Sequence, residues 1–245
     1  MAVLLEGGCR VAHLREDAPQ VADAPLVDDA PLVEGAPRVD DAPLVEGELI
    51  SLRVVEVAPG ESREFLSEDR DQVLFALGSC TLVSDGVEHD VEPQSGVFIP
   101  AKKAFRFENR GTQPVSFVSV ECPATNASVP EAVVRLADQR AMPTADRWYR
   151  VLIDSEVTQF VGSIPPGRAP DHFHEYEEVL FILRGEGRMW AGPTSTPIAY
   201  GSCIYLPRRQ VHCVENTGTG ELRLLGVFYP AGSPAVRYDA PTQNP

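Results

Sequence analysis

Two short segments in the second half of the chain limit its possible folds most strongly. The first contains His172, His174 and Glu178 directly before an apolar run, with a glycine at either end. The second contains Pro207 and His212 among β-branched and aromatic residues, and it also begins with a glycine. Three of the chain's five histidines lie in these segments. The pattern predicts a metal site built on β-strands.

The spacing of the candidate ligands supports this interpretation. His172 and His174 are two residues apart, so in an extended strand both imidazoles leave the same face. Glu178 opens the next apolar run, and His212 comes from a distant strand. Three neutral imidazoles and one carboxylate can share a divalent transition metal (Fe, Mn, Ni, Co or Zn) and leave coordination positions open. The alternative is a set of unrelated histidines, each bonded to a backbone carbonyl.

The order of these residues resembles the paired motifs of the cupin superfamily. The first family motif is a glycine, two histidines separated by one residue, a glutamate and a second glycine. The second motif is a glycine, a proline, a histidine and an asparagine. The matching residues here are Gly167, His172, His174, Glu178 and Gly185, then Gly201, Pro207, His212 and Asn216. Two departures occur: Gly167 is one residue closer to its histidine than usual, and Arg209 replaces a glycine. The resemblance implies a β-barrel with one metal, but no particular reaction.

An internal repeat extends this resemblance to the first half of the chain. Residues 73–75 match residues 179–181, and Asn109 follows a proline by nine positions, as Asn216 does. Many short strand-like runs separated by turn residues, with little helical periodicity, indicate antiparallel barrels. We therefore predict an all-β chain of two tandem cupin barrels, each a double-stranded β-helix or jelly roll.

The first half lacks the predicted ligands. In this alignment the positions of His172, His174, Glu178 and His212 are taken by Leu66, Glu68, Gln72 and Phe105. We expect this barrel to bind no metal by the same scheme. It either supports the fold by burying surface against its twin or another subunit, or it offers its own cavity to a ligand.

An acidic repeat precedes the barrels. Residues 17–47 repeat with a period of six, and a proline recurs at positions 19, 25, 31, 37 and 43. Each proline removes a backbone donor, so we expect a mobile tail of polyproline character, or alternatively a docking arm for a partner. The predicted boundaries are 1–47 for this tail, 48–127 for the N-terminal barrel without metal ligands, 128–146 for a connector with a short helix near 131–138, 147–236 for the metal-binding C-terminal barrel, and 237–245 for a C-terminal tail.

Composition excludes several classes of partner. A net charge of -15 would repel nucleic acid phosphates. No apolar run approaches the ~20 residues of a membrane helix. The first residues lack the features of a secretory signal, and five cysteines without paired spacing favour reduced thiols. We therefore expect a cytoplasmic protein, and the resemblance implies a homodimer.

The strand pattern also suggests residues for the cavity around the metal. We predict Gln159, Arg188, Trp190 and Tyr205 as substrate-binding residues. Tyr176, between the ligands, is a candidate catalytic acid or base, or alternatively a packing residue. The leading function is a metal-dependent enzyme acting on a small oxygen-rich metabolite, with dioxygenase chemistry. A non-redox isomerase, lyase or cyclase is the alternative, and a non-catalytic barrel that binds a small ligand is a third.

Overall fold

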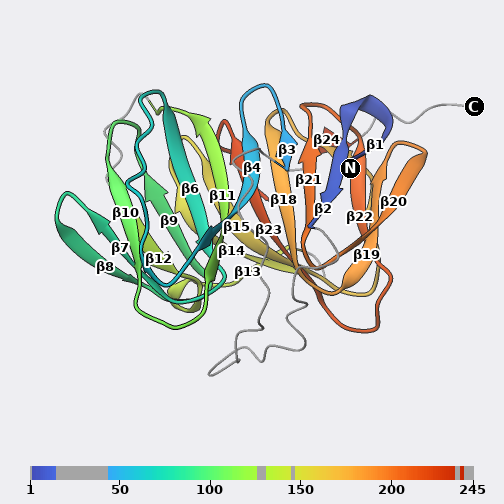
Figure 1. Cartoon of the computed structure of the whole chain (residues 1–245). Helices are drawn as coiled ribbons and strands as arrows, with labels where there is room; N and C mark the ends of the chain where they lie inside the picture. Colours follow the sequence, from blue (N-terminus) through green and yellow to red (C-terminus); the bar gives the residue numbers. More distant parts are fainter. Residues whose placement is uncertain (1, 15–43, 126–130, 145–146, 235–237, 240–245) are drawn as a thin grey trace, which may run out of the picture.

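The computed structural model describes residues 2–14, 44–125, 131–144, 147–234 and 238–239. Two β-barrels lie side by side, the N-terminal one in green and teal and the C-terminal one in yellow to red (Figure 1). Each barrel consists of a larger and a smaller antiparallel sheet. The prediction of an all-β chain with two tandem barrels is confirmed.

The N-terminal barrel pairs a six-stranded sheet with a four-stranded one. In spatial order the larger sheet contains β12 (Ala132–Arg135), β9 (Ser95–Ile99), β6 (Arg70–Ala76), β11 (Val115–Pro123), β4 (Ser51–Val57) and β3 (Val45–Glu46). The smaller sheet contains β5 (Gly60–Glu61), β10 (Phe105–Asn109), β7 (Cys80–Ser84) and β8 (Val87–Val91).

The C-terminal barrel is larger. Its eight-stranded sheet contains, in spatial order, β1 (Val3–Leu4), β2 (Arg10–His13), β21 (Ser202–Leu206), β18 (Glu177–Arg184), β23 (Leu222–Tyr229), β15 (Thr158–Ile164), β14 (Arg147–Asp154) and β13 (Met142–Thr144). The opposing sheet contains β20 (Thr194–Ala199), β19 (Glu186–Ala191), β22 (His212–Asn216), β17 (His172–Phe173) and β24 (Tyr238–Asp239), and β16 (Gly167–Arg168) also pairs with β22.

Alternation along most strands of the eight-stranded sheet separates two hydrophobic clusters. On β18, Val179 and Phe181 join a cluster shared with the N-terminal barrel, whereas Leu180 and Ile182 point into the C-terminal barrel. The shared cluster receives Phe75 and other buried residues from the larger N-terminal sheet. Both faces of the sheet are therefore buried, which explains why its strands read as continuous apolar runs.

The two motif asparagines have the same structural role in the two barrels. Each side-chain amide donates to two backbone carbonyls, and each side-chain oxygen accepts from the backbone N–H two residues later. The acceptors are Val57 and Gln113 for Asn109, at 3.0 and 2.7 Å, and Ile164 and Gly220 for Asn216, at 2.8 and 2.7 Å. The repeat seen in the sequence is thus also present in these hydrogen bonds, through which each asparagine fixes a turn.

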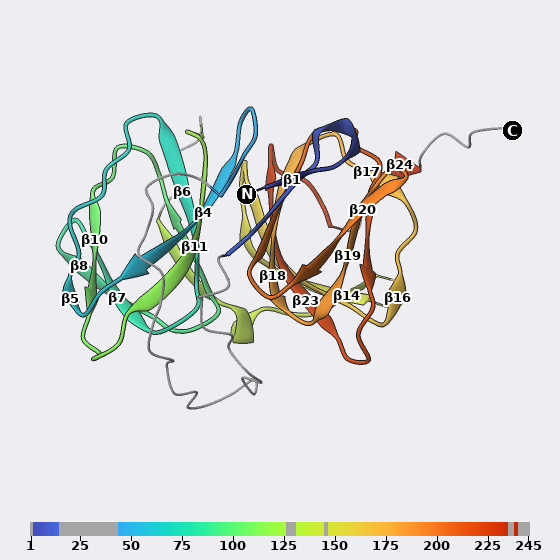
Figure 2. The same ribbon diagram turned by 45° about the vertical axis from the view of Figure 1, so that its right-hand side comes forward.

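The chain ends differ from the predicted boundaries. Strands β1 and β2, joined by the 3-10 turn η1 (Glu6–Gly8), extend the C-terminal barrel, where Arg10 is the register partner of Tyr205. Figure 2 shows this blue segment lying against the orange barrel. The predicted tail of residues 1–47 is therefore wrong for residues 3–13 and for β3, while residues 15–43 lie outside the described part of the chain.

The connector and the C-terminal end also carry strands. The helix expected near residues 131–138 is instead β12 followed by the 3-10 turn η2 (Leu136–Asp138). Within the predicted C-terminal tail, β24 pairs with β17, and residues 237 and 240–245 lie outside the described part. All five cysteines are buried with free thiols. In the ranges that the structure describes, no helix is long and apolar enough to cross a membrane.

Candidate metal centre

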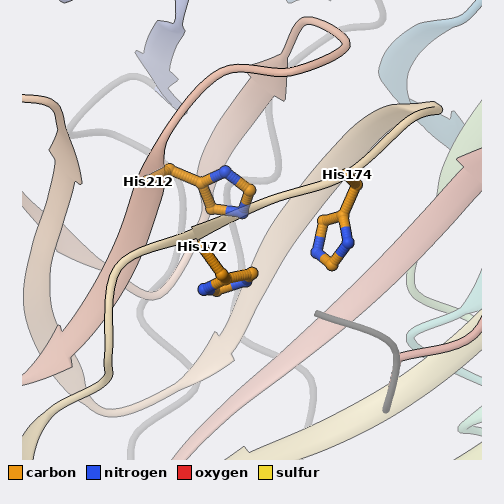
Figure 3. Close-up of side chains that lie close together, drawn as sticks. All are labelled: His172, His174 and His212. Atoms are coloured by element: carbon orange, nitrogen blue, oxygen red, sulfur yellow. The ribbon is translucent and has the colours of Figure 1, made fainter. Parts of the chain in front are cut away.

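Three histidines lie close together in the C-terminal barrel, two on neighbouring strands and one in a loop (Figure 3). His172 lies on β17 and is the register partner of His212, the first residue of β22. His174 follows β17 in the loop that leads into β18. One ligand nitrogen of each ring lies within 4.8 Å of the other two. This is the spacing of atoms that can share a metal ion.

Backbone carbonyls fix the tautomers of two of these rings. His172 Nδ1 lies 3.0 Å from the carbonyl oxygen of Pro170, and His212 Nδ1 lies 2.7 Å from that of Gln210. A carbonyl oxygen only accepts hydrogen bonds, so each Nδ1 carries the proton. Each neutral ring therefore presents the Nε2 lone pair, as a metal ligand must.

Tyr176 fixes the third ring. Its hydroxyl oxygen lies 3.1 Å from the carbonyl oxygen of Ser233, to which it donates, and 3.0 Å from His174 Nδ1. Because the hydroxyl hydrogen is used in the bond to Ser233, the hydroxyl oxygen accepts a hydrogen bond from Nδ1–H of His174. The two rings also stack, with centroids 4.8 Å apart. The predicted catalytic residue Tyr176 is thus buried, with its hydroxyl bonded to His174, and it orients this candidate ligand.

Glu178 adds the carboxylate of the predicted set. Its Oε2 lies 3.9 Å from His174 Nε2 and 3.6 Å from His212 Nε2. Burial raises the pKa of Glu178 to about 8. Burial and the neighbouring His172 lower the pKa of His212 well below its usual value, which keeps this ring neutral. Neutral imidazoles around a buried carboxylate suit a divalent cation, which would favour the ionised carboxylate.

The turn after β21 supports the centre from outside. Arg209, which replaces the glycine of the family motif, has a φ of 61°, in the left-handed region that favours glycine. Its backbone N–H donates to the carbonyl of His174 over 2.7 Å, and its guanidinium meets Glu175 at 2.8 Å. The motif therefore keeps its backbone shape at this position despite the change of residue.

A cavity of about 100 Å³ opens on the ligand set. Its middle is apolar, with Phe160, Leu180, Val214, Leu224 and Phe228 among the residues that line it. More polar residues line it from β13 and β14: Thr144, Arg147, Trp148 and Tyr149. The sequence interpretation missed these four residues and the two phenylalanines. Strand parity, counted from Glu178 across the sheet, would have found the phenylalanines, but no sequence signal marks Thr144 or residues 147–149.

The four residues predicted to bind substrate do not line this cavity, and the prediction is corrected here. Gln159 donates from Nε2 to the carbonyl of Leu74 in the other barrel, at 3.1 Å. Tyr205 lies beside Arg10 at a second hollow between the N-terminal segment and β21. Both have the wrong parity: Tyr205 is the register partner of Val179, which faces the N-terminal barrel, whereas Leu206 pairs with Glu178.

Arg188 and Trp190 face outward from the smaller sheet for the same reason. They alternate with Met189 and Ala191, which belong to the interior cluster. Arg188 bonds to the hydroxyl of Ser195, at 3.0 Å, and the indole N–H of Trp190 donates to Glu215 over 2.8 Å. These contacts lie on the outer surface of the barrel.

Phenylalanines occupy the matching position of the N-terminal barrel. Phe65 bridges to Phe105 as His172 does to His212, and their rings stack with centroids 5.3 Å apart. The backbone N–H of Lys102 donates to the carbonyl of Ser67, as that of Arg209 does to His174. The histidine positions therefore correspond to Phe65 and Ser67. The predicted counterparts, Leu66 and Glu68, were one residue out of register. None of these counterparts is a histidine or cysteine, as expected from the sequence.

Comparison with known proteins agrees with this architecture. The family model described as a cupin domain (Cupin_2) matches residues 160–228. The C-terminal barrel is a cupin domain. Auxin-binding protein 1 of Arabidopsis thaliana is 31% identical over 83 residues, which cover 30% of this chain and 42% of the relative. The oxalate-binding protein of Thermotoga maritima is 36% identical over 67 residues, covering 26% of this chain and 55% of the relative. The chain thus spans about half the length of these curated relatives.

Solved structures extend the likeness to both barrels. A glyoxylate-induced protein from Pseudomonas aeruginosa has a TM-score of 0.67 at 18% identity, covering 91% of this chain and 97% of that one. Protein Ylba from E. coli has a TM-score of 0.71 at 12% identity, covering 93% of each chain. Oxalate decarboxylase from Bacillus subtilis has a TM-score of 0.61 at 13% identity, covering 74% and 68%. At these identities the likeness shows the cupin fold of both barrels alone.

Proposed function

We propose that this protein is a metal-dependent cupin enzyme that acts on a small, oxygen-rich metabolite by dioxygenase chemistry. His172, His174 and His212 would hold one divalent transition metal through Nε2, with Glu178 as the fourth ligand. The observation that carries the proposal is the composition of the cavity next to this set. Apart from the four ligands, the described lining contains no aspartate, glutamate, lysine or histidine.

This composition favours chemistry centred on the metal. Isomerases and lyases that act without redox chemistry need a side chain that moves protons at the substrate. A redox-active divalent metal would supply open coordination positions for a chelating substrate and electrons for reaction with dioxygen. The chain's own contribution is to hold that metal and to surround the substrate with apolar walls from Phe160, Leu180 and Val214, which exclude water.

Glu178 has a further use in such a reaction. Burial alone raises its pKa to about 8, and a bound divalent cation would favour the ionised form. As a carboxylate beside the substrate position, it can take the proton of an enol or catechol hydroxyl. That step leaves an anionic oxygen on the substrate, in a site built from neutral imidazoles.

Oxygen uptake tests the proposal. Protein purified without oxygen and loaded with Fe(II) is mixed with catechols, 1,3-diketones and α-hydroxy ketones in an oxygen electrode. The zinc-loaded protein serves as the redox-inert control, and Glu178→Gln tests the proton acceptor. Substrate-dependent oxygen uptake by the iron form alone supports the proposal. Turnover of any of these compounds by the zinc form, without oxygen uptake, would contradict it.

Tyr149 favours a second candidate, a non-redox isomerase, lyase or cyclase. Its phenol lines the cavity and can donate or accept a proton near a bound carbonyl. This reading predicts anaerobic turnover that is lost in Tyr149→Phe. A barrel that only binds a ligand is the third candidate, supported by the names of the oxalate-binding and auxin-binding relatives. Tight binding of oxalate by the metal-loaded protein, without turnover, would favour it.

A further inference from the structure

The cavity at the metal centre has a second polar end, formed by β13 and the start of β14. Arg147 and Thr144 are register partners on β14 and β13, and both line the cavity. Arg147 is the one lysine or arginine among the described residues of the lining, in a chain with a net charge of -15. A guanidinium in the cavity wall is suited to bind an anionic group.

Strand parity supports this orientation of Arg147. On β14, Tyr149 and Val151 pack against the interior cluster of the C-terminal barrel, and Arg147 has the same parity. Arg150, on the alternate face, instead donates to the carbonyl of Leu136 over 3.1 Å and lies over the ring of Trp148. The same strand therefore places one arginine toward the cavity and the other toward the junction of the barrels.

The register also places Arg147 at the far end of the sheet from the ligands. Glu178 is level with Thr158 through their shared partner Phe228, whereas Tyr149 is level with Gly162. Arg147 lies two residues beyond Tyr149, six positions along β15 from the row of Glu178. At ~3.3 Å per residue, this separation is about 20 Å between backbone levels, before the two side chains extend toward each other. Apolar side chains, among them Phe160, Leu180 and Leu224, line the space between.

We propose that the cavity accepts an elongated acid, with an oxygen-chelating head at the metal, an apolar body, and a carboxylate or similar anionic group at Arg147. This inference rests on the proposed function, because it assumes a metal with open coordination positions. It narrows the substrate class from small oxygen-rich metabolites in general to those with a second, anionic end. It also gives the start of β14, paired with the connector strand β13, a part in substrate selection.

Hydroxamates provide the probe, since they chelate divalent metals through two oxygens. Zinc-loaded protein is titrated by calorimetry with the monohydroxamates of succinic, adipic and suberic acids. Each is compared with its methyl ester, which lacks the charge at the far end. The expected result is about tenfold or tighter binding of the free acid for the chain length that reaches Arg147, as a charged hydrogen-bonded pair provides. This comparison uses the wild-type protein alone and so does not depend on a variant that folds.

Variants then locate the effect. Arg147→Gln is expected to bind acid and ester equally, whereas Arg150→Gln, on the opposite face of the same strand, keeps the preference. The proposal is overturned if the wild type binds acid and ester alike at every length, or if Arg147→Gln keeps the preference. Metal content and binding of the esters are measured in parallel. If the wild type lacks metal or does not bind the esters, the proposed metal centre is refuted. If metal content and ester binding are intact but the free acid is not preferred over the ester, only the role of Arg147 is refuted.

Discussion

Removing the hydroxyl of Tyr176 should weaken metal binding without removing a ligand. In Tyr176→Phe the ring can still stack on His174 and contact Phe228, whose centroids lie 4.8 and 4.5 Å away. The variant loses the acceptor for Nδ1–H of His174 and the donor to the carbonyl of Ser233. The proton of His174 is then free to move to Nε2, the atom that should bind the metal.

The expected loss follows from the role of such outer partners. Removing a group that orients a metal-bound histidine typically costs 10- to 100-fold in affinity, or about 1.4–2.7 kcal/mol. Competition with a chromophoric chelator measures the dissociation constant for zinc and nickel. Tyr200→Phe is the matched control, because this ring packs on Phe181 at the junction of the barrels and does not line the metal cavity.

A second substitution tests the same reasoning from the backbone side. A Cβ added at Gly232 would lie 2.1 Å from Cε1 of Tyr176, so Gly232→Ala must displace either that ring or the loop that accepts its hydroxyl bond at Ser233. Its metal affinity should fall by at least as much as that of Tyr176→Phe. Affinities within twofold of the wild type for both variants would refute the assignment of Tyr176 as the residue that orients His174.

Three further predictions follow from burial and charge. Metal affinity should rise about tenfold per pH unit up to about pH 8 and then level off. Burial raises the pKa of Glu178 to about 8, and this side chain must release its proton to bind a metal. A pH-independent affinity between pH 6 and 8, measured by the same competition, would show that Glu178 is not a ligand. Phe75→Ala, at a fully buried position between the barrels, should reduce the free energy of unfolding by about 3–5 kcal/mol in urea denaturation; a loss below 1 kcal/mol would contradict the shared core. Asn216→Ala should reduce the free energy of unfolding by about 1–3 kcal/mol, since it leaves the carbonyls of Ile164 and Gly220 without this donor. The metal stoichiometry of this variant should stay unchanged, and a loss of bound metal would give Asn216 a direct role at the centre.

The parts of the fold that follow from local patterns could be predicted from the sequence. Histidines two residues apart, a carboxylate opening an apolar run and a distant histidine after a proline have a spacing that only a few β-folds bring together. The repeat of Asn109 and Asn216 identified the second barrel because each residue fixes the same turn. Such signals depend on contacts within a strand pair, and the spacing of residues along the sequence reflects these contacts.

The errors arose where the structure depends on partners far away in the chain. Residues 3–13 are too short and irregular to be recognised as strands without β21 beside them. Alternation along β15 left open which face points inward, so Gln159 was assigned to the wrong side. One extra residue between Ser67 and Gln72, relative to His174 and Glu178, shifted the register of the first barrel. Arg147 reaches the cavity because β13 and β14 extend the eight-stranded sheet beyond β15, a pairing that no local pattern encodes.

The central claim is that a metal binds in the C-terminal barrel alone, through the three histidines and Glu178. Metal analysis by mass spectrometry of protein purified without oxygen tests this most directly, with His212→Ala and Glu178→Ala beside Phe105→Leu. Phe105 holds the position of His212 in the other barrel, so its variant is the matched control. We expect about one equivalent of one metal in the wild type and in Phe105→Leu, and a loss in both ligand variants. A wild type that takes up no metal, or a His212→Ala variant that keeps a full equivalent, would contradict the account.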